Sequence, residues 1–431
     1  MHTLLVMVML SLLMMVAPAQ ADTPGAWSKG APFPEPSEEL VGLSTGGKFY
    51  VFGGLGPGWI PQGLVYEYDP SANKWTKNKP MALPAHHVAF TELNGEFYAF
   101  GGFVPPQSGP PAWVPINNAW EYDPAHDSWN ALAAMPSARG SVVAATVNGK
   151  IYVIGGGAMH PGSKEAALYP TRPHRSVGTV EEYDPKTNSW SERSSMPTAR
   201  NHAAVGAVNN KIYVIGGRLG SAFIFTASNT NVVEEYDPAT DQWGLVRARM
   251  PTERSGGAWG VYNGRIYVAG GEHQDGHLMA AFRALEAYDP ATNSWSELPM
   301  MPMPRHGLAG AVVGHRLHLA SGDIQSAGIT GMHVVTDAHD IFEFSDRSTP
   351  SSSRPTNRLC AMGPMAQRRD NLRPQKSRSV ILDLFLPSLT ISFVTWRTLV
   401  TVASSLNDSC GCGLLVIDKV CPLFQLVTDI D

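Results

Sequence analysis

Four arginines stand at one repeated position of the chain, at the end of a Met-Pro-x-x-Arg pattern that precedes an apolar segment. They are Arg139, Arg200, Arg254 and Arg305, and imidazoles lie close to this position at His87, His202 and His306. A guanidinium group offers a fixed fork of donors that suits a carboxylate ligand. If the equivalent positions meet in space, these side chains form an anion-binding site. In the alternative interpretation, each arginine braces its own part of the fold through hydrogen bonds to loop carbonyls.

The elements that must position these residues follow an internal repeat of about fifty residues. An apolar run that ends in a glycine pair occurs five times, and Ser321-Gly322 is a degraded sixth copy. Turn residues precede the runs, as in Asn148-Gly149 and Asn263-Gly264. Asn-Gly between apolar runs predicts a β-hairpin, because a type I′ turn needs positive φ at both central residues.

A second feature of the repeat is Tyr-Asp-Pro, followed by a Trp six residues after the Asp. The Asp-Pro turn predicts that the Tyr and the Trp lie on neighbouring antiparallel strands as a packed aromatic pair. The pairs are Tyr68 and Trp75, Tyr122 and Trp129, Tyr183 and Trp190, Tyr236 and Trp243, and Tyr288 and Trp295. Each unit therefore contains four strands, a to d, with the Asn-Gly turn between a and b and the Asp-Pro turn between c and d.

This four-strand unit resembles the Kelch repeat, and the resemblance runs from Trp27 to Phe344. It implies a six-bladed Kelch β-propeller with four antiparallel strands per blade. The strand that contains Trp27 lacks preceding strands, and the strand Ile341–Phe344 lacks a following Trp. We therefore expect the N-terminal strand to close the last blade, since this closure leaves no long strand edge exposed.

The strand order places the a–b and c–d turns on one face, and the b–c loops and d–a connections on the other. The turns are short and uniform, whereas the loops vary in length and composition, as binding loops on a rigid scaffold do. Three aromatic residues in the b–c loops are candidate contacts, namely Trp59, Trp113 and Tyr169. They either stack on sugar rings or anchor a partner, or they cover the small cores of their own loops.

The remaining segments suggest export. Residues 1–21 contain a short apolar run and end in Ala19-Gln20-Ala21, which predicts a signal peptide and a secreted or periplasmic protein. The propeller is expected over residues 22–346. Residues 347–431 lack the repeat, contain all four cysteines, and are interpreted as a poorly ordered extension or one of doubtful reading frame.

The charge and the motifs of the chain exclude several classes of function. The net charge is −5 and the chain has no basic block, which excludes a nucleic-acid-binding protein held by phosphate contacts. The loop from His273 to His277 follows no known metal-ligand spacing, so we predict no metal and no cofactor. The absence of cysteine from residues 22–359 excludes the copper-radical oxidases that also contain Kelch blades.

These observations predict an exported, monomeric binding module that takes a glycan or a protein partner on the b–c and d–a face. No membrane association is expected. The chain also resembles the secreted bacterial N-acetylneuraminate epimerase, and this resemblance implies sialic-acid mutarotation as the alternative. Such a reaction needs an acid and a base beside a held sugar carboxylate. Whether the protein is an enzyme is left open at this point.

Overall fold

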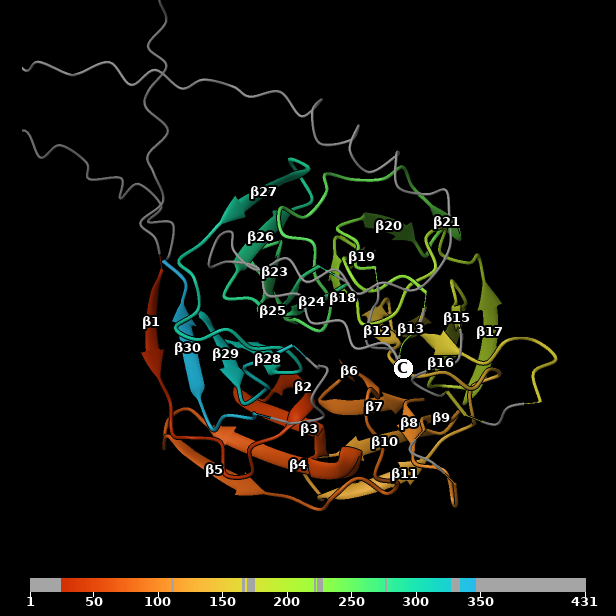
Figure 1. The fold of residues 1–431 in the computed structure, drawn as a ribbon, viewed down its shortest axis with the longest axis horizontal. Coiled ribbons are helices and arrows are strands. Elements are labelled where there is room, and N and C mark those ends of the chain that lie inside the picture. The colour runs from red at the N-terminus through yellow and green to blue at the C-terminus, as the bar shows by residue number, and fades with distance from the viewer. Residues whose placement is uncertain are drawn as a thin grey trace, which may run out of the picture. The chain divides into compact units, whose positions relative to one another are not determined.

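The computed structural model describes residues 25–109, 112–164, 167–168, 175–220, 222, 228–275, 277–326 and 334–345. In this part of the chain, six four-stranded antiparallel sheets form the blades of a propeller around a central channel (Figure 1). The predicted signal peptide, Tyr169 and the predicted extension 347–431 lie outside the described residues. Within the described residues, no helix is long and apolar enough to cross a membrane.

The strands of each blade pair in the order a, b, c, d, and the a strands of neighbouring blades contact one another around the channel. Blade 1 contains β2 (Glu38–Thr45), β3 (Lys48–Gly56), β4 (Ile60–Asp69) and β5 (Lys74–Lys77). Blade 2 contains β6 (Ala89–Leu93), β7 (Glu96–Phe100), β10 (Ala119–Asp123) and β11 (Ser128–Ala131). Blade 3 contains β12 (Val143–Val147), β13 (Lys150–Ile154), β16 (Val180–Asp184) and β17 (Ser189–Arg193). Blade 4 contains β18 (Ala204–Val208), β19 (Lys211–Ile215), β20 (Val233–Asp237) and β21 (Gln242–Trp243). Blade 5 contains β22 (Ala258–Tyr262), β23 (Arg265–Ala269), β26 (Leu285–Asp289) and β27 (Ser294–Glu297). Blade 6 contains β28 (Ala309–Val313), β29 (Arg316–Ala320), β30 (His339–Glu343) and β1 (Ala26–Lys29).

The b–c loops carry short elements of their own above the blades. They are the 3-10 turn η1 (Pro57–Trp59) and three small hairpins, β8 (Phe103–Val104) with β9 (Val114–Pro115), β14 (Gly157–Ala158) with β15 (Arg175–Ser176), and β24 (Glu272–Gln274) with β25 (Met279–Ala281). The described parts of these loops therefore contain regular structure.

The sixth blade is closed by the N-terminal strand, as predicted. β1 pairs antiparallel with β30, and Trp27 lies opposite Phe342 with ring centroids 5.0 Å apart. Figure 1 shows β1 and β30, the two ends of the colour range, side by side in this blade. The other five blades contain the predicted Tyr–Trp pairs, whose ring centroids are 4.8 to 5.2 Å apart. The six-bladed Kelch fold, with its closure, is confirmed.

The glycine pairs are required where neighbouring blades approach closely. Gly155 and Gly156 have φ of 70° and 103°, a backbone region that side chains rarely adopt. A Cβ atom at Gly155 would lie 2.7 Å from the carbonyl oxygen of Arg200, in the next blade. The pair therefore ends strand b and lets the following blade pack against it.

The channel between the a strands has two unequal ends. Towards the a–b turns it widens into a cavity of about 530 Å³. Towards the b–c loops the cavity is only about 60 Å³. Phe90, Ala144 and Trp259 line both cavities and mark the waist between them.

Candidate functional site at the channel mouth

The four arginines of the repeated position are buried inside the blades. The exposed fraction of each side chain is at most 2%, and each guanidinium group pairs with a carboxylate on strand c of its own blade. The N–O distances are 2.8 Å for Arg139 and Glu181, 2.5 Å for Arg200 and Glu234, 2.5 Å for Arg254 and Glu286, and 2.6 Å for Arg305 and Asp340. Burial lowers the pKa of all four groups, and the paired carboxylates oppose that shift in pKa.

Hydrogen bonds to carbonyl oxygens add to the contacts of these arginines. Arg139, for example, donates to the carbonyls of Gly155, Thr179 and Val153, all in its own blade. The Nε atoms of Arg200, Arg254 and Arg305 are buried without a hydrogen bond. Because all four guanidinium groups are buried and paired with carboxylates, the expected positive arc at the mouth is corrected, and the geometry fits the bracing interpretation.

The other two blades differ at both of these positions. Where the repeated position holds Ser37 or Ala85, the equivalent position on strand c holds Tyr66 or Trp120, in place of Glu or Asp. Ala85 and Trp120 belong to one apolar cluster. The acid on strand c is thus present in the four blades that carry the arginine, which supports a structural role for the pair.

A belt of six residues, one from each blade, surrounds the channel mouth two positions after the arginine position. All six have left-handed backbone conformations, with φ between 51° and 63°: Glu39, His87, Ser141, His202, Gly256 and Gly307. Main-chain hydrogen bonds of 2.9 to 3.2 Å link successive blades from His87 to Gly307, and the amide of Leu40 donates to the carbonyl of Gly307. Between blades 1 and 2, the link is an ion pair of 3.1 Å between His87 Nε2 and Glu39 Oε2.

The belt brings two of the predicted site residues together. The ring centroids of His87 and His202 are 4.6 Å apart, and the carboxylate of Glu39 lies beside them. Burial lowers the pKa of His202 well below its ordinary value, and the charge of Arg218 adds to the shift. Burial opposes ionisation of Glu39, but the imidazoles of His87 and His306 outweigh it and hold the pKa of this carboxyl below its ordinary value. The His87 imidazole, a neutral His202 imidazole and the Glu39 carboxylate thus share the mouth.

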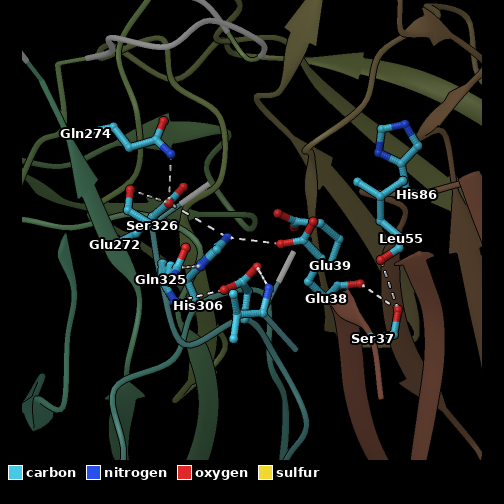
Figure 2. Close-up of polar contacts among 12 residues, drawn as sticks. Ser37, Glu38, Glu39, Leu55, His86, Glu272, Gln274, His306, Gln325 and Ser326 are labelled. Carbon is cyan, nitrogen blue, oxygen red and sulfur yellow. Dashed lines mark hydrogen bonds and ion pairs between the residues drawn. The ribbon is translucent and has the colours of Figure 1, made fainter. Parts of the chain in front are cut away.

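His306, the third predicted imidazole, belongs to an adjoining polar cluster. Figure 2 shows Glu272 with Gln274 and Ser326 on one side of His306, and Glu38 and Glu39 on the other. His306 Nε2 lies 3.4 Å from Glu38 Oε2 and 3.7 Å from Glu272 Oε2. Burial opposes its protonation, but these carboxylates raise the pKa of His306 to about 10. At neutral pH His306 is therefore an imidazolium.

Arg218 is the other cation of this cluster. Its Nη2 donates to Glu272 Oε1 at 2.5 Å, and both side chains are buried. Arg218 is not among the predicted site residues, because it belongs to a b–c loop and not to the repeated arginine position. The Arg218–Glu272 pair at the mouth therefore comes from b–c loop residues that the repeat pattern does not mark, whereas His306 and Glu38 stand beside the repeated position.

The loop aromatics pack against one another. Trp113 belongs to a buried apolar cluster with Phe103, Leu168 and Ala222, and the half-buried Trp59 packs against it at 6.1 Å between ring centroids. The Trp113 ring also lies 4.8 Å from that of His87. Trp59 and Trp113 therefore cover a small core over the mouth, which agrees with the second of the two interpretations given for them.

The loop at His273 forms a local turn. Asp275 Oδ2 lies 3.0 Å from His273 Nε2, and Asp275 Oδ1 accepts the amide hydrogens of His277 and Leu278. These contacts hold the pKa of Asp275 well below its ordinary range. The carboxylate thus stabilises its own turn.

The comparisons with known proteins agree with this architecture. The model of the Kelch motif matches residues 41–82, 84–136 and 138–197, and that of the KLHDC2/KLHL20/DRC7 Kelch-repeats domain matches residues 171–322. The chain is thus a Kelch-repeat β-propeller protein. The curated proteins that it is similar to include Kelch-like protein terF of Aspergillus terreus, which is 29% identical over 55% of this chain and 50% of its own length.

Two further likenesses cover different shares of the chain. Kelch-like protein 15 of Danio rerio is 31% identical over 43% of this chain and 31% of its own length. The matched region thus spans half or less of these curated relatives. Among solved structures, that of YjhT aligns with a TM-score of 0.59 at 21% identity, covering 72% of this chain and 96% of that chain. This last likeness concerns the fold alone.

Proposed function

We propose that this protein is a binding module that holds a protein partner on the face formed by its b–c loops and d–a connections. The small cavity that described residues line at the mouth of the channel carries this proposal. The cavity of about 60 Å³ behind the belt is far smaller than the roughly 300 Å³ at which pockets for small ligands begin. Ile60, the first residue of strand c in blade 1, and Leu278, in the b–c loop of blade 5, have exposed fractions of 63% and 48%. A broad loop surface with apolar tips suits a protein more than an enclosed ligand.

The test is crosslinking of the full chain to its partners, followed by mapping of the crosslinked peptides. The variant Ile60→Asp/Leu278→Asp should lose the partner peptides that wild type retains. Leu245→Asp is the matched control, because Leu245 is an equally apolar side chain, 89% exposed. It lies between Gly244 and Arg247, whose amides still bond strand c of blade 4, and so belongs to the outer edge of that blade and not to the loop face. Equal crosslinking of the double variant and wild type would remove this face as the binding surface.

A carbohydrate function is the second candidate, either glycan binding or mutarotation of sialic acid. The polar cluster supports it, because the Glu272 carboxylate and the His306 imidazolium supply a base and an acid 3.7 Å apart. A glycan array tests binding. Proton NMR of freshly dissolved sialic acid anomers tests catalysis, since only a mutarotase accelerates their equilibration. Unchanged equilibration and an empty array would leave the protein partner as the function.

Export and the monomeric state complete the proposal. The apolar run and the Ala19-Gln20-Ala21 pattern support cleavage after Ala21. N-terminal sequencing of the exported protein should then begin at Asp22. Light scattering on a sizing column should give the mass of one chain.

A further inference from the structure

We propose that Glu39, His87 and His202 form a binding site for a divalent transition-metal ion, represented by Zn²⁺, at the channel mouth. One carboxylate oxygen and one ring nitrogen from each histidine lie within 4.8 Å of one another. Around tetrahedral zinc, with ligand distances of about 2.0–2.2 Å, neighbouring ligand atoms are about 3.3–3.5 Å apart. His87 Nε2 and Glu39 Oε2 are 3.1 Å apart, so one edge of such a polyhedron is already close to the required length.

The outer contacts of the two imidazoles are made through Nδ1 of each and not through Nε2. His202 Nδ1 donates to Asn201 Oδ1, so the lone pair of His202 is on Nε2. His87 Nδ1 lies 2.5 Å from His86 Nδ1. Metal-bound histidines generally make such a second contact through the other ring nitrogen, which fixes the ring orientation and the tautomer. The chain supplies this contact for both histidines from the preceding residue.

Two buried polar atoms at this place lack a hydrogen bond. His87 is 8% exposed, and its Nε2 is close to Glu39 but makes no hydrogen bond of acceptable direction. Ser141, on the same belt, is 6% exposed, and its hydroxyl is also without a partner. Both residues line the cavity of about 60 Å³, which is large enough for a few water molecules. A metal would use the first atom as a ligand, and a metal-bound water would reach the second.

The charges around the site favour a cation at Glu39. Arg218 and His306 lie near the belt and pair with Glu272 and Glu38, and the charge of His306 also acts on Glu39. The two cations thus face three acidic residues, which leaves Glu39 as an anionic ligand. Two imidazoles and one carboxylate suit zinc and its transition-metal neighbours, whereas magnesium and calcium prefer oxygen ligands alone.

The experiment is titration of the metal-free full chain with Zn²⁺ by calorimetry, and with Co²⁺ by its visible absorption. All four cysteines are replaced by serine in every protein compared, because thiolates bind the same metals. The variants are His87→Asn and His202→Asn, since Asn tolerates the left-handed backbone of the belt. Circular dichroism confirms that each is folded. His126→Asn is the control, as it removes an exposed imidazole beside a carboxylate, Asp123, away from the belt.

We expect one Zn²⁺ per wild-type chain, and at least tenfold weaker binding in each belt variant with no loss in His126→Asn. Glu39→Gln should also weaken binding at least tenfold, which tests the carboxylate separately. Absence of stoichiometric binding to the wild type would overturn the proposal. Equal affinity in folded His87→Asn and His202→Asn proteins would overturn it too, because the metal would then bind elsewhere.

Discussion

The indole Nε1 of Trp27 donates a hydrogen bond of 2.9 Å to the carbonyl oxygen of Pro299, which is 272 residues away along the chain. The same bond occurs in every other blade, from the strand-d tryptophan to a carbonyl just after the preceding blade. The donors and acceptors are Trp75 and Ala31, Trp129 and Lys79, Trp190 and Ala133, Trp243 and Ser194, and Trp295 and Ala248. The N-terminal strand therefore makes in blade 6 the same interblade hydrogen bond that strand d makes in the five blades of continuous chain.

Trp27→Ala should lower the free energy of unfolding by about 3 kcal/mol, since truncating a large packed aromatic residue leaves a cavity. Trp295→Ala is the comparison, because Trp295 makes the same contacts within a blade of continuous chain. Urea unfolding of both variants should give similar losses. A loss at Trp27 well below that at Trp295 would mean that the N-terminal strand contributes little to closure.

Arg139→Ala should cost about 3–5 kcal/mol of unfolding free energy, because it leaves the buried Glu181 carboxylate without its cation. Adding Glu181→Trp reproduces the Ala85 and Trp120 combination of blade 2 and should restore part of the loss. Urea unfolding measures both. A neutral Arg139→Ala variant would argue against bracing.

Gly256 and Gly307 occupy equivalent positions of the belt, yet substitution to Ala should affect them unequally. Both pay the left-handed backbone cost of about 1 kcal/mol. A Cβ atom at Gly307 would lie 2.6 Å from the amide nitrogen of Glu39, whereas at Gly256 the nearest atoms are 3.9 Å away. The steric conflict should add about 1–3 kcal/mol at Gly307 alone. Thermal unfolding of the two variants gives the comparison, and equal losses would contradict it.

The repeat pattern predicted the fold because glycine pairs, Asp-Pro turns and aromatic pairs each determine local backbone geometry. Its spacing aligned Arg139 with Arg200, but spacing does not show where a side chain points. The sequence did contain a sign that these arginines are buried, because an acidic residue stands on strand c of each blade, Glu181 for Arg139 and Glu234 for Arg200. The repeat also placed His87 and His202 near the predicted mouth, and Glu39 stands at the equivalent position of blade 1, two residues after Ser37. The repeat does not show that Glu39 and His202 meet, because only closure of the ring brings blades 1 and 4 together.

Lowering the pH should destabilise the junction of blades 6 and 1, because two imidazoles are buried there. His339 Nδ1 donates to the carbonyl of Ala31, so its Nε2 accepts from His318 Nδ1 at 3.0 Å. Burial lowers the pKa of His318 to about 4 and that of His339 to about 3. Unfolded histidine titrates near 6.5, so the unfolded chain binds protons first as the pH falls.

The free energy of unfolding should therefore decline from about pH 6.5 towards pH 3, by up to roughly 1.4 kcal/mol per pH unit for each imidazole. The variant His318→Gln/His339→Gln should show a shallower decline in urea unfolding across this range. His160→Gln, which removes an exposed imidazole, should keep the slope of the wild type. An unchanged slope in the double variant would assign acid sensitivity to other groups.

The belt at the channel mouth is built differently at one of its six joints. Main-chain hydrogen bonds make five of them, and such bonds persist whichever side chains the chain carries. The joint between blades 1 and 2 depends on the side chains of Glu39 and His87. Exchange of a single residue there can loosen or tighten the aperture while the other joints stay intact. The width of the mouth is thus adjustable at a place separate from the seam where the two ends of the propeller meet.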